Sequence, residues 1–499
     1  MQKATAEVLN NFNSLFEERK EQILNTKTYI KIKGTAYYVS NNGDDNNDGL
    51  TPKTAWKTLN KVTTANLNEG DGVFFERGNL FRGKFTAQNG VTYSAYGQGE
   101  KPKFYAHDKP LTNPLLWELY DEEYHIWKLK EKILDVGTIV FNDGEYHSRK
   151  LIPSYKNSTF VCRETPDEIF DIYEQMTCDL DLFWHYDDRH TITPSKNENF
   201  PIPLIDDQSF GDLYLRCDKG NPAKIFTSIE ALTRVYLITA RQTKNVTIDN
   251  LCIKYAGMHA VAAGGPCENL TVTNCEMGWI GGCIQHYYGT DPNYPEGKRG
   301  SVTRFGNAIE IYGACNGYTV CNNYIYQVYD AGITHQVTTS DKKLLKNIEY
   351  SNNLVEKCVY GIEYFLDQIN GENESQMENV LMSQNFIRLS GYGWGQQRHN
   401  KETPALIKGW SYVNTAKNFR IEDNIFDRCA YRMVHLVAER QEFCPTMCGN
   451  TYIQNLGMTL GQYGGKENGE PPILPFDNKA NETIENIFGE KNAKVYYIE

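Results

Sequence analysis

The 499-residue sequence predicts an all-β fold, a parallel β-solenoid that carries an N-terminal helix and a β-rich insertion. The main observation is a loose repeat after residue 245, in which an alternating strand is followed by an Asn, a second short strand and usually a Gly. The repeat is marked by Asn250, Asn274, Asn323, Asn353, Asn385 and Asn424, with Asn450 as a candidate seventh. Successive positions lie 24 to 49 residues apart, and the longest interval contains either two coils or one coil with an insertion.

A solenoid gives these asparagines a physical role. Each coil contributes short strands that pair with the coils above and below, and alternate side chains face a narrow apolar interior. An Asn at a recurring corner can adopt unusual backbone angles and pass amide hydrogen bonds from coil to coil. A leucine-rich horseshoe would need Leu at fixed offsets and a helical repeat would need a 3.6-residue period, and the sequence shows neither.

Five segments are expected along the chain. Residues 1–34 have apolar residues at helical spacing between charged ones, which predicts an amphipathic helix packed on the body. Residues 35–105 lead into the solenoid, and residues 106–234 lack the repeat but contain strand-like runs, which predicts a β-rich insertion subdomain. Residues 235–463 hold the main coils and the candidate cleft, and residues 464–499 form a polar tail that ends in a short strand.

Composition narrows the classes of partner. A net charge of -12 argues against nucleic acid as the main partner, although local patches leave an acidic sugar polymer open. No run of 18 apolar residues occurs, so no membrane partner is expected. The 13 Cys lack regular spacing and indicate free thiols, which favours a cytoplasmic bacterial protein, with secretion as the alternative if a signal peptide has been removed. The 33 Tyr either stack on sugars or fill outer strand faces.

Four stretches near the N-terminus carry a family resemblance. They are YYVSNNGDDNNDG (37–49), AWKTLNKV (55–62), GDGVFFERG (70–78) and YSAYGQGEKP (93–102). They resemble the first segment of carbohydrate-active enzymes with a right-handed parallel β-helix, a group of glycoside hydrolases and polysaccharide lyases. Together with the Asn-marked coils, the resemblance covers residues 37–105 and 235–460. It implies right-handed coils and a carbohydrate partner, an oligosaccharide or polysaccharide, and it is less specific for the reaction.

One strand of each coil is expected to place polar residues in register on the outer face. The inward residues are Ile284, Ile309, Ile333, Ile362, Ile407 and Val434, and the outward residues that follow them are Gln285, Glu310, Thr334, Glu363, Lys408 and His435. Since neighbouring coils lie about 4.8 Å apart, Glu310 and Glu363 would have backbones roughly 10 Å apart. Their side chains could then converge to about 6.5–9.5 Å, the range of an inverting glycosidase pair.

The candidate catalytic residues are therefore carboxylates. Asp330 lies at the turn that precedes the middle coil, and from there it could approach either Glu to about 5 Å, nearer to retaining geometry. We expect Asp330 and Glu363 to be the working pair, with Glu310 as the third carboxylate, because crowded carboxylates push their pKa values apart. The alternative for each is a solvated strand face or a turn-forming Asp.

Further residues are candidates for substrate binding. The loop GYGWGQQRHN (391–400) would supply Trp394 as a stacking face and Gln397 and Arg398 as donors, with an ordinary turn as the alternative. The other candidates come from neighbouring coils: Gln285, His286, Gln336, Lys408, Trp410 and His435. His335 should alternate inward as a buried, hydrogen-bonded side chain.

The stretch DDNNDG (44–49) is similar to a Ca²⁺ loop in its charges and its Gly. Asp44, Asp45 and Asp48 are thus candidate ligands of a structural Ca²⁺, and an Asx-rich turn is the alternative. The Glu that completes an EF-hand is missing, and no phosphate loop or dinucleotide fingerprint occurs. We therefore expect the protein to require no cofactor.

Three functions remain open. The leading hypothesis is a glycoside hydrolase, in which one carboxyl group protonates the leaving oxygen and another activates water or attacks carbon. The alternative is a polysaccharide lyase, with Lys408, Arg398 or His435 serving as base or as a cation for a uronic acid. The third is a glycan-binding solenoid without catalysis. Carboxylates outnumber cations at the aligned positions, which favours the hydrolase. The oligomeric state is not predicted.

Overall fold

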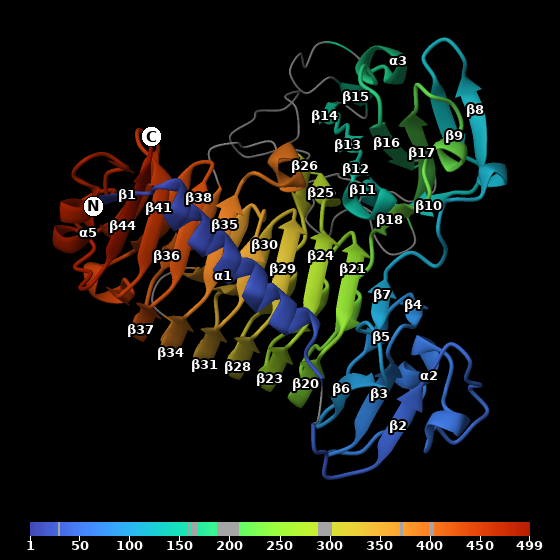
Figure 1. The fold of residues 1–499 in the computed structure, drawn as a ribbon, viewed down its shortest axis with the longest axis horizontal. Coiled ribbons are helices and arrows are strands. Elements are labelled where there is room, and N and C mark those ends of the chain that lie inside the picture. The colour runs from blue at the N-terminus through green and yellow to red at the C-terminus, as the bar shows by residue number, and fades with distance from the viewer. Residues whose placement is uncertain are drawn as a thin grey trace.

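The computed structural model describes residues 1–27, 30–156, 159–161, 168, 170–186, 209–287, 302–369, 373–398 and 404–499. Its body is a right-handed parallel β-helix, in which three long sheets run along one axis (Figure 1). Strands of successive coils pair in parallel, so the predicted all-β fold with parallel coils is confirmed.

The three sheets are named A, B and C. Sheet A contains β4 (Leu80–Arg82), β7 (Lys103–Tyr105), β11 (Val136–Phe141), β12 (Tyr146–His147), β18 (Ile229–Thr233), β21 (Cys252–Ala256), β24 (Glu276–Ile280), β29 (Tyr324–Val328), β32 (Leu354–Glu356), β35 (Phe386–Ser390), β38 (Ile425–Cys429), β41 (Thr451–Asn455), β44 (Lys494–Ile498) and β1 (Gln2–Lys3). Sheet B contains β2 (Ala36–Val39), β3 (Gly72–Glu76), β6 (Thr92–Tyr96), β20 (Lys244–Asp249), β23 (Cys267–Thr273), β28 (Cys315–Cys321), β31 (Leu344–Ser351), β34 (Gln376–Ser383), β37 (Ala416–Glu422) and β40 (Thr446–Cys448). Sheet C contains β5 (Phe85–Thr86), β19 (Ile238–Thr239), β22 (Val261–Gly264), β27 (Ile309–Tyr312), β30 (Ala331–Thr339), β33 (Tyr360–Gln368), β36 (Ala405–Val413), β39 (Arg432–Ala438), β42 (Thr459–Gly465) and β43 (Leu474–Pro475).

The interior is a continuous apolar core made by alternate strand residues. On sheet C, the inward residues Ile309, Ile333, Ile362 and Ile407 stack in register and are each 0% exposed. Removing such side chains from water is the main favourable term of the fold. The residues next to them along each strand must point outward, and this alternation places the polar row on the outer face of sheet C.

The corner asparagines form two columns, whereas the sequence predicted one. In the first column the backbone is left-handed, with φ near +55° to +60° at Asn250, Asn274 and their later equivalents Asn322 and Asn352. Such angles are accessible to Asn at a low cost. In the second column the side chains pass amide hydrogen bonds from coil to coil through Asn323, Asn353, Asn385, Asn424 and Asn450. In the later coils the two roles belong to neighbouring residues, such as Asn322 and Asn323 or Asn352 and Asn353.

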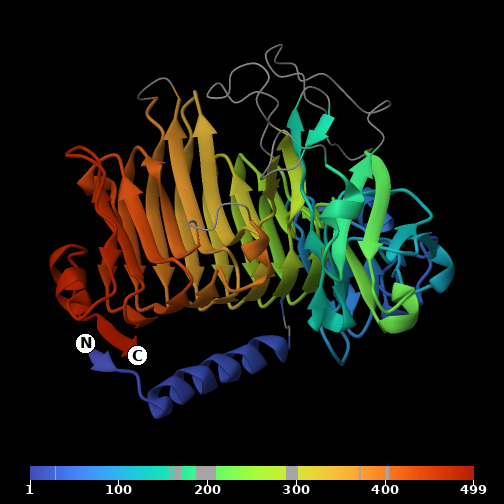
Figure 2. The same cartoon turned by 90° about the horizontal axis from the view of Figure 1, so that it is seen from above.

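Helix α1 (Ala6–Leu24) lies lengthwise along the outer face of sheet A (Figure 2). Its side chains Phe16 and Ile23 are buried there against Tyr324 and Phe386, with 5.1 Å between the ring centroids of Phe16 and Phe386. The guanidinium carbon of Arg388 lies 3.4 Å from the centroid of the Phe16 ring. The predicted amphipathic helix packed on the body is confirmed.

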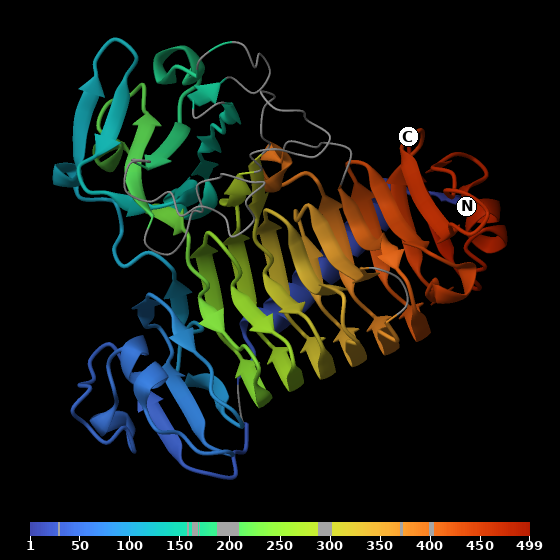
Figure 3. The ribbon, with the colours of Figure 1, turned by 180° about the vertical axis from the view of Figure 1, so that it is seen from behind.

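The chain segment between β7 and β18 contains a separate sheet beside the first coils (Figure 3). Its strands are β8 (Trp117–Asp121), β9 (Ile126–Leu129), β10 (Ile133–Leu134), β13 (Arg149–Lys150), β16 (Asp181–Tyr186) and β17 (Phe210–Arg216), with the hairpin β14 (Ser154–Lys156) and β15 (Thr159–Val161) nearby. Strands β11 and β18 join this region to sheet A. The short helices of the chain are α2 (Leu59–Thr64), α3 (Ile172–Gln175), α4 (Pro222–Ile225) and α5 (Ala480–Asn486).

Two smaller findings complete the fold. The cysteines within the described ranges are free thiols, as predicted. None of the helices described is both long enough and apolar enough to cross a membrane. The five segment boundaries that the sequence suggested stay predictions.

Candidate active site

A cleft of about 770 Å³ lies over the outer face of sheet C. Glu310, Asp330 and Glu363 all line it, although they are separated by up to 53 residues in the sequence. They come from β27, from the turn before β30, and from β33, which are three consecutive strands of sheet C. The structure thus places the three predicted carboxylates in one cavity.

The register of the polar row is the predicted one from Glu310 onward. Glu310 pairs with Thr334, Thr334 with Glu363, Glu363 with Lys408, and Lys408 with His435. One rung therefore separates Glu310 from Glu363, as expected from the strand spacing.

The first member of the predicted row is wrong. Gln285 lies in β25 (Cys283–Tyr287), which leaves the coils and pairs antiparallel with β26 (Val302–Phe305). The strand that pairs with β27 on the side away from β30 is β22, where Ala262 lies opposite Glu310. Gly281 and Gly282 have φ values of +95° and +87°, and this left-handed turn directs the chain out of the coil. Gln285 still reaches the cleft, at its rim, as an exposed residue.

Glu363 is the most enclosed of the three carboxyl groups. Its side chain is 6% exposed, and its Oε1 accepts a hydrogen bond of 2.5 Å from the indole nitrogen of Trp410. Burial raises the pKa of Glu363 to about 7, and the nearby Asp330 carboxylate adds to the rise, while Lys408 at 3.9 Å opposes it. Glu363 can therefore carry a proton near neutral pH.

Asp330 has a different partner. Its Oδ1 accepts a charge-assisted hydrogen bond of 2.5 Å from Arg398. Within the described ranges Oδ2 of Asp330 has no hydrogen-bond donor, so this oxygen is available to a ligand in the cleft. The two neighbouring carboxyl groups thus meet different partners, an indole and a guanidinium.

Glu310 accepts hydrogen bonds on both oxygens. Asn307 and Gln336 donate to Oε2 at 2.6 and 3.0 Å, and His259 Nε2 lies 3.2 Å from Oε1. The backbone N–H of Asn307 donates to His259 Nδ1 at 2.8 Å, so the neutral imidazole carries its proton on Nε2 and points it at Glu310. Every partner of Glu310 among the described residues is a hydrogen-bond donor, so the contacts hold its carboxyl group in one orientation.

Lys408 and His435 continue the polar row but lie beside the cleft and do not line it. Lys408 is 4% exposed, with its ammonium 3.5 Å from the Trp410 ring and 4.0 Å from the Tyr360 ring. Burial lowers the pKa of Lys408 to about 8, against the opposing effect of Glu363. Burial also lowers the pKa of His435 to about 3, so this imidazole is neutral, and Arg432 donates to its Nδ1.

Two loop residues have other roles than the predicted ones. Trp394 is 1% exposed, packs on Tyr329 and donates its indole N–H to the carbonyl of Gln327. It therefore presents no free face for stacking on a sugar. Gln397 contacts the insertion, where its side chain accepts from the backbone of Lys150 and donates to the carbonyl of Ser148. The polar groups of both side chains are therefore hydrogen-bonded to other segments of the chain. Of the three predicted loop residues, Arg398 is the one that lines the cleft.

The remaining predictions have mixed outcomes. Gln336 and Trp410 line the cleft, as proposed. His286 lies in β25, but its side chain is outside the described residues. His335 is buried, contacts the Tyr350 hydroxyl at 2.8 Å and faces inward, as expected.

The calcium hypothesis finds no ligand cluster. Asp45 accepts from Lys57 and Thr58, and Asp48 accepts from Thr54 and Leu50. Asp44 likewise accepts from Asn46, so all three carboxylates are used within the turn. Among the described residues, no group of three or more His, Cys, Asp or Glu is placed to hold a metal ion. The Asx-rich turn accounts for these residues, and a structural Ca²⁺ stays a prediction.

Sequence reasoning missed His259, Asn307 and the aromatic residues Tyr236 and Phe305 that pack around the imidazole. His259 precedes a strand whose central outward residue is Ala262, so the alignment of polar residues passed over that coil. A search for the coil between Asn250 and Asn274 would have found it, since every interval of the repeat must contribute a strand to sheet C.

Fold and site together define a parallel β-helix protein with a carboxylate-lined cleft. No family model matches the chain. A lacto-N-biosidase of Bifidobacterium longum subsp. longum is 40% identical over 81 residues, a match that spans 14% of this chain and 5% of that relative.

Solved structures offer further likenesses. The complex structure of XylC with xylose has 11% identity and a TM-score of 0.44, over 93% of this chain and 83% of that one. A GH136 lacto-N-biosidase from Eubacterium ramulus has 11% identity and a TM-score of 0.39, over 99% of this chain and 70% of that one. A polygalacturonase from Erwinia carotovora ssp. carotovora has 9% identity and a TM-score of 0.31, over 95% and 97%.

Proposed function

We propose that this protein is a glycoside hydrolase that cleaves an O-glycosyl bond of an oligosaccharide or polysaccharide. The observation that carries the proposal is the opposite environment of two carboxyl groups in one cleft. Glu363 is buried, with its pKa raised to about 7, whereas Asp330 is ion-paired with Arg398. Two carboxyl groups in contrasting environments, one able to donate a proton and one with a free oxygen, are what glycoside hydrolysis requires.

The roles follow from the contacts. Glu363 donates its proton to the glycosidic oxygen as the bond breaks, because it is the carboxyl group that stays protonated near neutral pH. Asp330 uses its unoccupied oxygen either to attack the anomeric carbon or to activate water. Glu310, whose two oxygens already accept from His259, Asn307 and Gln336, holds a sugar hydroxyl. Trp410, which lines the cleft, holds the acid in place through its indole N–H.

The lyase alternative is less well supported. It needs a base or an unpaired cation facing the substrate, but Lys408 is packed between Tyr360 and Trp410 and does not line the cleft. Arg398 reaches the cleft, where Asp330 neutralises it. Arg241 also lines the cleft and forms no ion pair among the described residues, so the charge of the preferred sugar is left to the substrate screen. If the protein is cytoplasmic, we propose an imported oligosaccharide as its substrate.

The test begins with a screen of aryl glycosides and of oligosaccharides with neutral and uronic ends. On the substrate found, Glu363→Gln and Asp330→Asn should each lower kcat by about 10²–10⁴-fold, the usual contribution of acid–base groups. Glu349→Gln, an exposed carboxylate of sheet B, is the matched control and should keep full activity. The anomeric form of the first product, read by NMR, distinguishes Asp330 as nucleophile from Asp330 as base.

Turnover retained by both cleft variants would reject these roles. A product with a conjugated C=C bond that absorbs in the ultraviolet would replace the hydrolase with the lyase. Glycan binding without any turnover would support a binding solenoid instead.

A further inference from the structure

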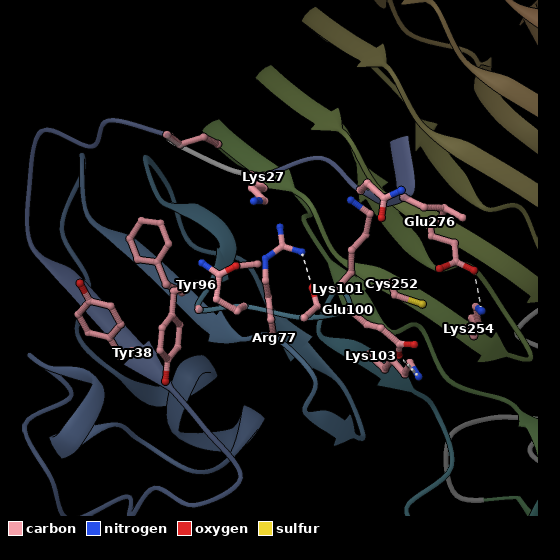
Figure 4. A pocket seen from close by; sticks show the side chains of 18 residues that line it. Lys27, Tyr38, Arg77, Tyr96, Glu100, Lys101, Lys103, Cys252, Lys254 and Glu276 are labelled. Atoms are coloured by element: carbon pink, nitrogen blue, oxygen red, sulfur yellow. Dashed lines mark hydrogen bonds and ion pairs between the residues drawn. The ribbon is translucent and has the colours of Figure 1, made fainter. Parts of the chain in front are cut away.

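A second cavity, of about 1010 Å³, lies between the outer face of sheet A, the lead-in segment and the residues Asn25, Lys27 and Ile30 (Figure 4). Its lining includes side chains of β2, β3, β6, β21 and β24. Among the described residues, none lines both this cavity and the cleft over sheet C. The cavity is therefore a separate feature of the molecule, on a different sheet.

The lining of this cavity is strongly cationic, in a chain whose net charge is -12. Five of its side chains are basic and two are acidic, namely Lys27, Arg77, Lys101, Lys103 and Lys254 against Glu100 and Glu276. Lys103 pairs with Glu100 at 2.7 Å, and Lys254 pairs with Glu276 at 2.6 Å. Within the described part of the chain, Lys27, Arg77 and Lys101 form no ion pair, so the wall carries an excess of three positive charges.

Two of these three cations are buried, which makes their charge costly. Arg77 is 9% exposed and Lys101 is 3% exposed. Their contacts are with neutral acceptors: Arg77 donates to the carbonyl of Thr26 at 2.8 Å, and Lys101 donates to Oδ1 of Asn250. Burial lowers the pKa of Lys101 to about 8. A buried cation without an ion-pair partner is costly, and one that lines a cavity is a candidate for binding an anion there.

One buried carboxylate lies close to this wall without lining the cavity. Asp249 is 1% exposed, and its charge favours the protonated forms of both Arg77 and Lys101. Its oxygens accept hydrogen bonds from Ser94 and Asn274 at 2.7 Å each. Asp249 thus offsets part of the charge, and a net positive excess still faces the cavity.

The other side of the cavity is aromatic. Tyr38, Phe74 and Tyr96 line it there, each half-buried. In Figure 4, Arg77 lies between the two tyrosines and Lys101. The rings of Tyr38 and Tyr96 lie 5.0 Å apart with an interplanar angle of 83°. Aromatic faces next to buried cations suit a ligand with both a ring and a negative charge.

We propose that this cavity binds an anionic sugar, carboxylated or sulfated, with its charged group against Arg77 and Lys101 and its ring on the aromatic wall. The site is independent of catalysis in the cleft over sheet C. Its ligand would bind without being cleaved, since the described wall holds no pair of unbonded carboxyl groups: Glu100 and Glu276 are both ion-paired.

Isothermal titration calorimetry on the full chain tests this site with four defined probes. Glucuronate and glucose 6-sulfate should bind, neutral glucose should not, and inorganic sulfate should bind more weakly than the sugar sulfate because it lacks a ring. Lys101→Met should weaken glucuronate binding about tenfold or more, the usual effect of losing one charge-assisted hydrogen bond. Lys53→Met, an exposed lysine elsewhere in the lead-in segment, is the matched control and should leave binding unchanged.

A second variant distinguishes a loss of binding contacts from a loss of the fold. Lys27 is exposed, so Lys27→Ala should leave the fold intact and still weaken glucuronate binding. Equal binding of glucose and glucuronate, or no binding of either anionic sugar, would overturn the proposal. Binding of inorganic sulfate alone would reduce the site to an adventitious ion site and overturn it as well. Because binding is measured without turnover, these outcomes do not depend on the proposed hydrolase.

Discussion

Replacing Lys408 with Met should raise the pKa of Glu363. The Lys408 ammonium lies 3.9 Å from Glu363 Oε1 and favours the ionised carboxylate. The substitution keeps the length of the stem, which packs on Tyr360 and Trp410, and removes the charge. Without that cation the proton on Glu363 is held more tightly, so the sign of the change is upward.

The magnitude follows from the distance. Two unit charges about 4 Å apart interact by about 1 kcal/mol in bulk water and about 4 kcal/mol at an effective dielectric constant of about 20. One pKa unit corresponds to about 1.36 kcal/mol, so the expected rise is about one to three units. The pKa of Glu363 is about 7 in the native protein, and we expect it near 8 or above in the variant.

The assay is a carboxyl titration followed by ¹³C NMR on protein labelled at glutamate, with Glu363→Gln used to assign the signal. Activity offers a second reading: because the acid must be protonated, turnover should fall above pH about 7 in the native protein, and this alkaline limb should move up in the variant. Lys417→Met, an exposed lysine of sheet B, is the control and should change neither. A pKa of Glu363 that stays the same or falls in Lys408→Met would refute the reasoning.

Three further predictions concern stability, each measured as the free energy of unfolding in urea. Asn353→Leu should cost about 3–5 kcal/mol, because it leaves the buried amides of Asn323 without their acceptor, and a loss below about 1 kcal/mol would show that the corner column is dispensable. Phe16→Ala should cost about 3–5 kcal/mol by emptying the contact of α1 with sheet A, and unchanged stability would mean that the helix docks without it. Gly306→Ala should also destabilise, since its φ is +137° and a Cβ would lie 2.1 Å from the Cα of Gly281; a variant as stable as the native protein would contradict that geometry.

Much of the candidate site could be predicted from the sequence because strand alternation is a local property. Once the Asn positions define the coils, the period of two decides which residues face outward, and pairing of equivalent strands then stacks Glu310, Glu363 and Lys408. The prediction was wrong for Gln285, where two left-handed glycines divert the chain into a hairpin. A pattern of inward and outward residues does not distinguish a strand inside the coil from one that leaves it.

The roles of the loop residues could not be predicted from local patterns. Trp394 and Gln397 have the residue types of a sugar-binding wall, yet one is buried against Tyr329 and the other is bonded to the insertion. Their partners lie 65 and 249 residues away in the sequence. His259 was missed for another reason, since the alignment of polar residues omitted the coil that contributes β22.

By itself, the sequence determined the solenoid, its repeat and the alignment of carboxylates on one face, because each of these depends on neighbouring residues and on a period that adds up coil after coil. Tertiary structure alone decided which carboxyl group keeps its proton. That outcome depends on how deeply Glu363 is buried and on which charges surround it. Both properties are set by segments that lie far apart in the sequence and meet only in the folded chain.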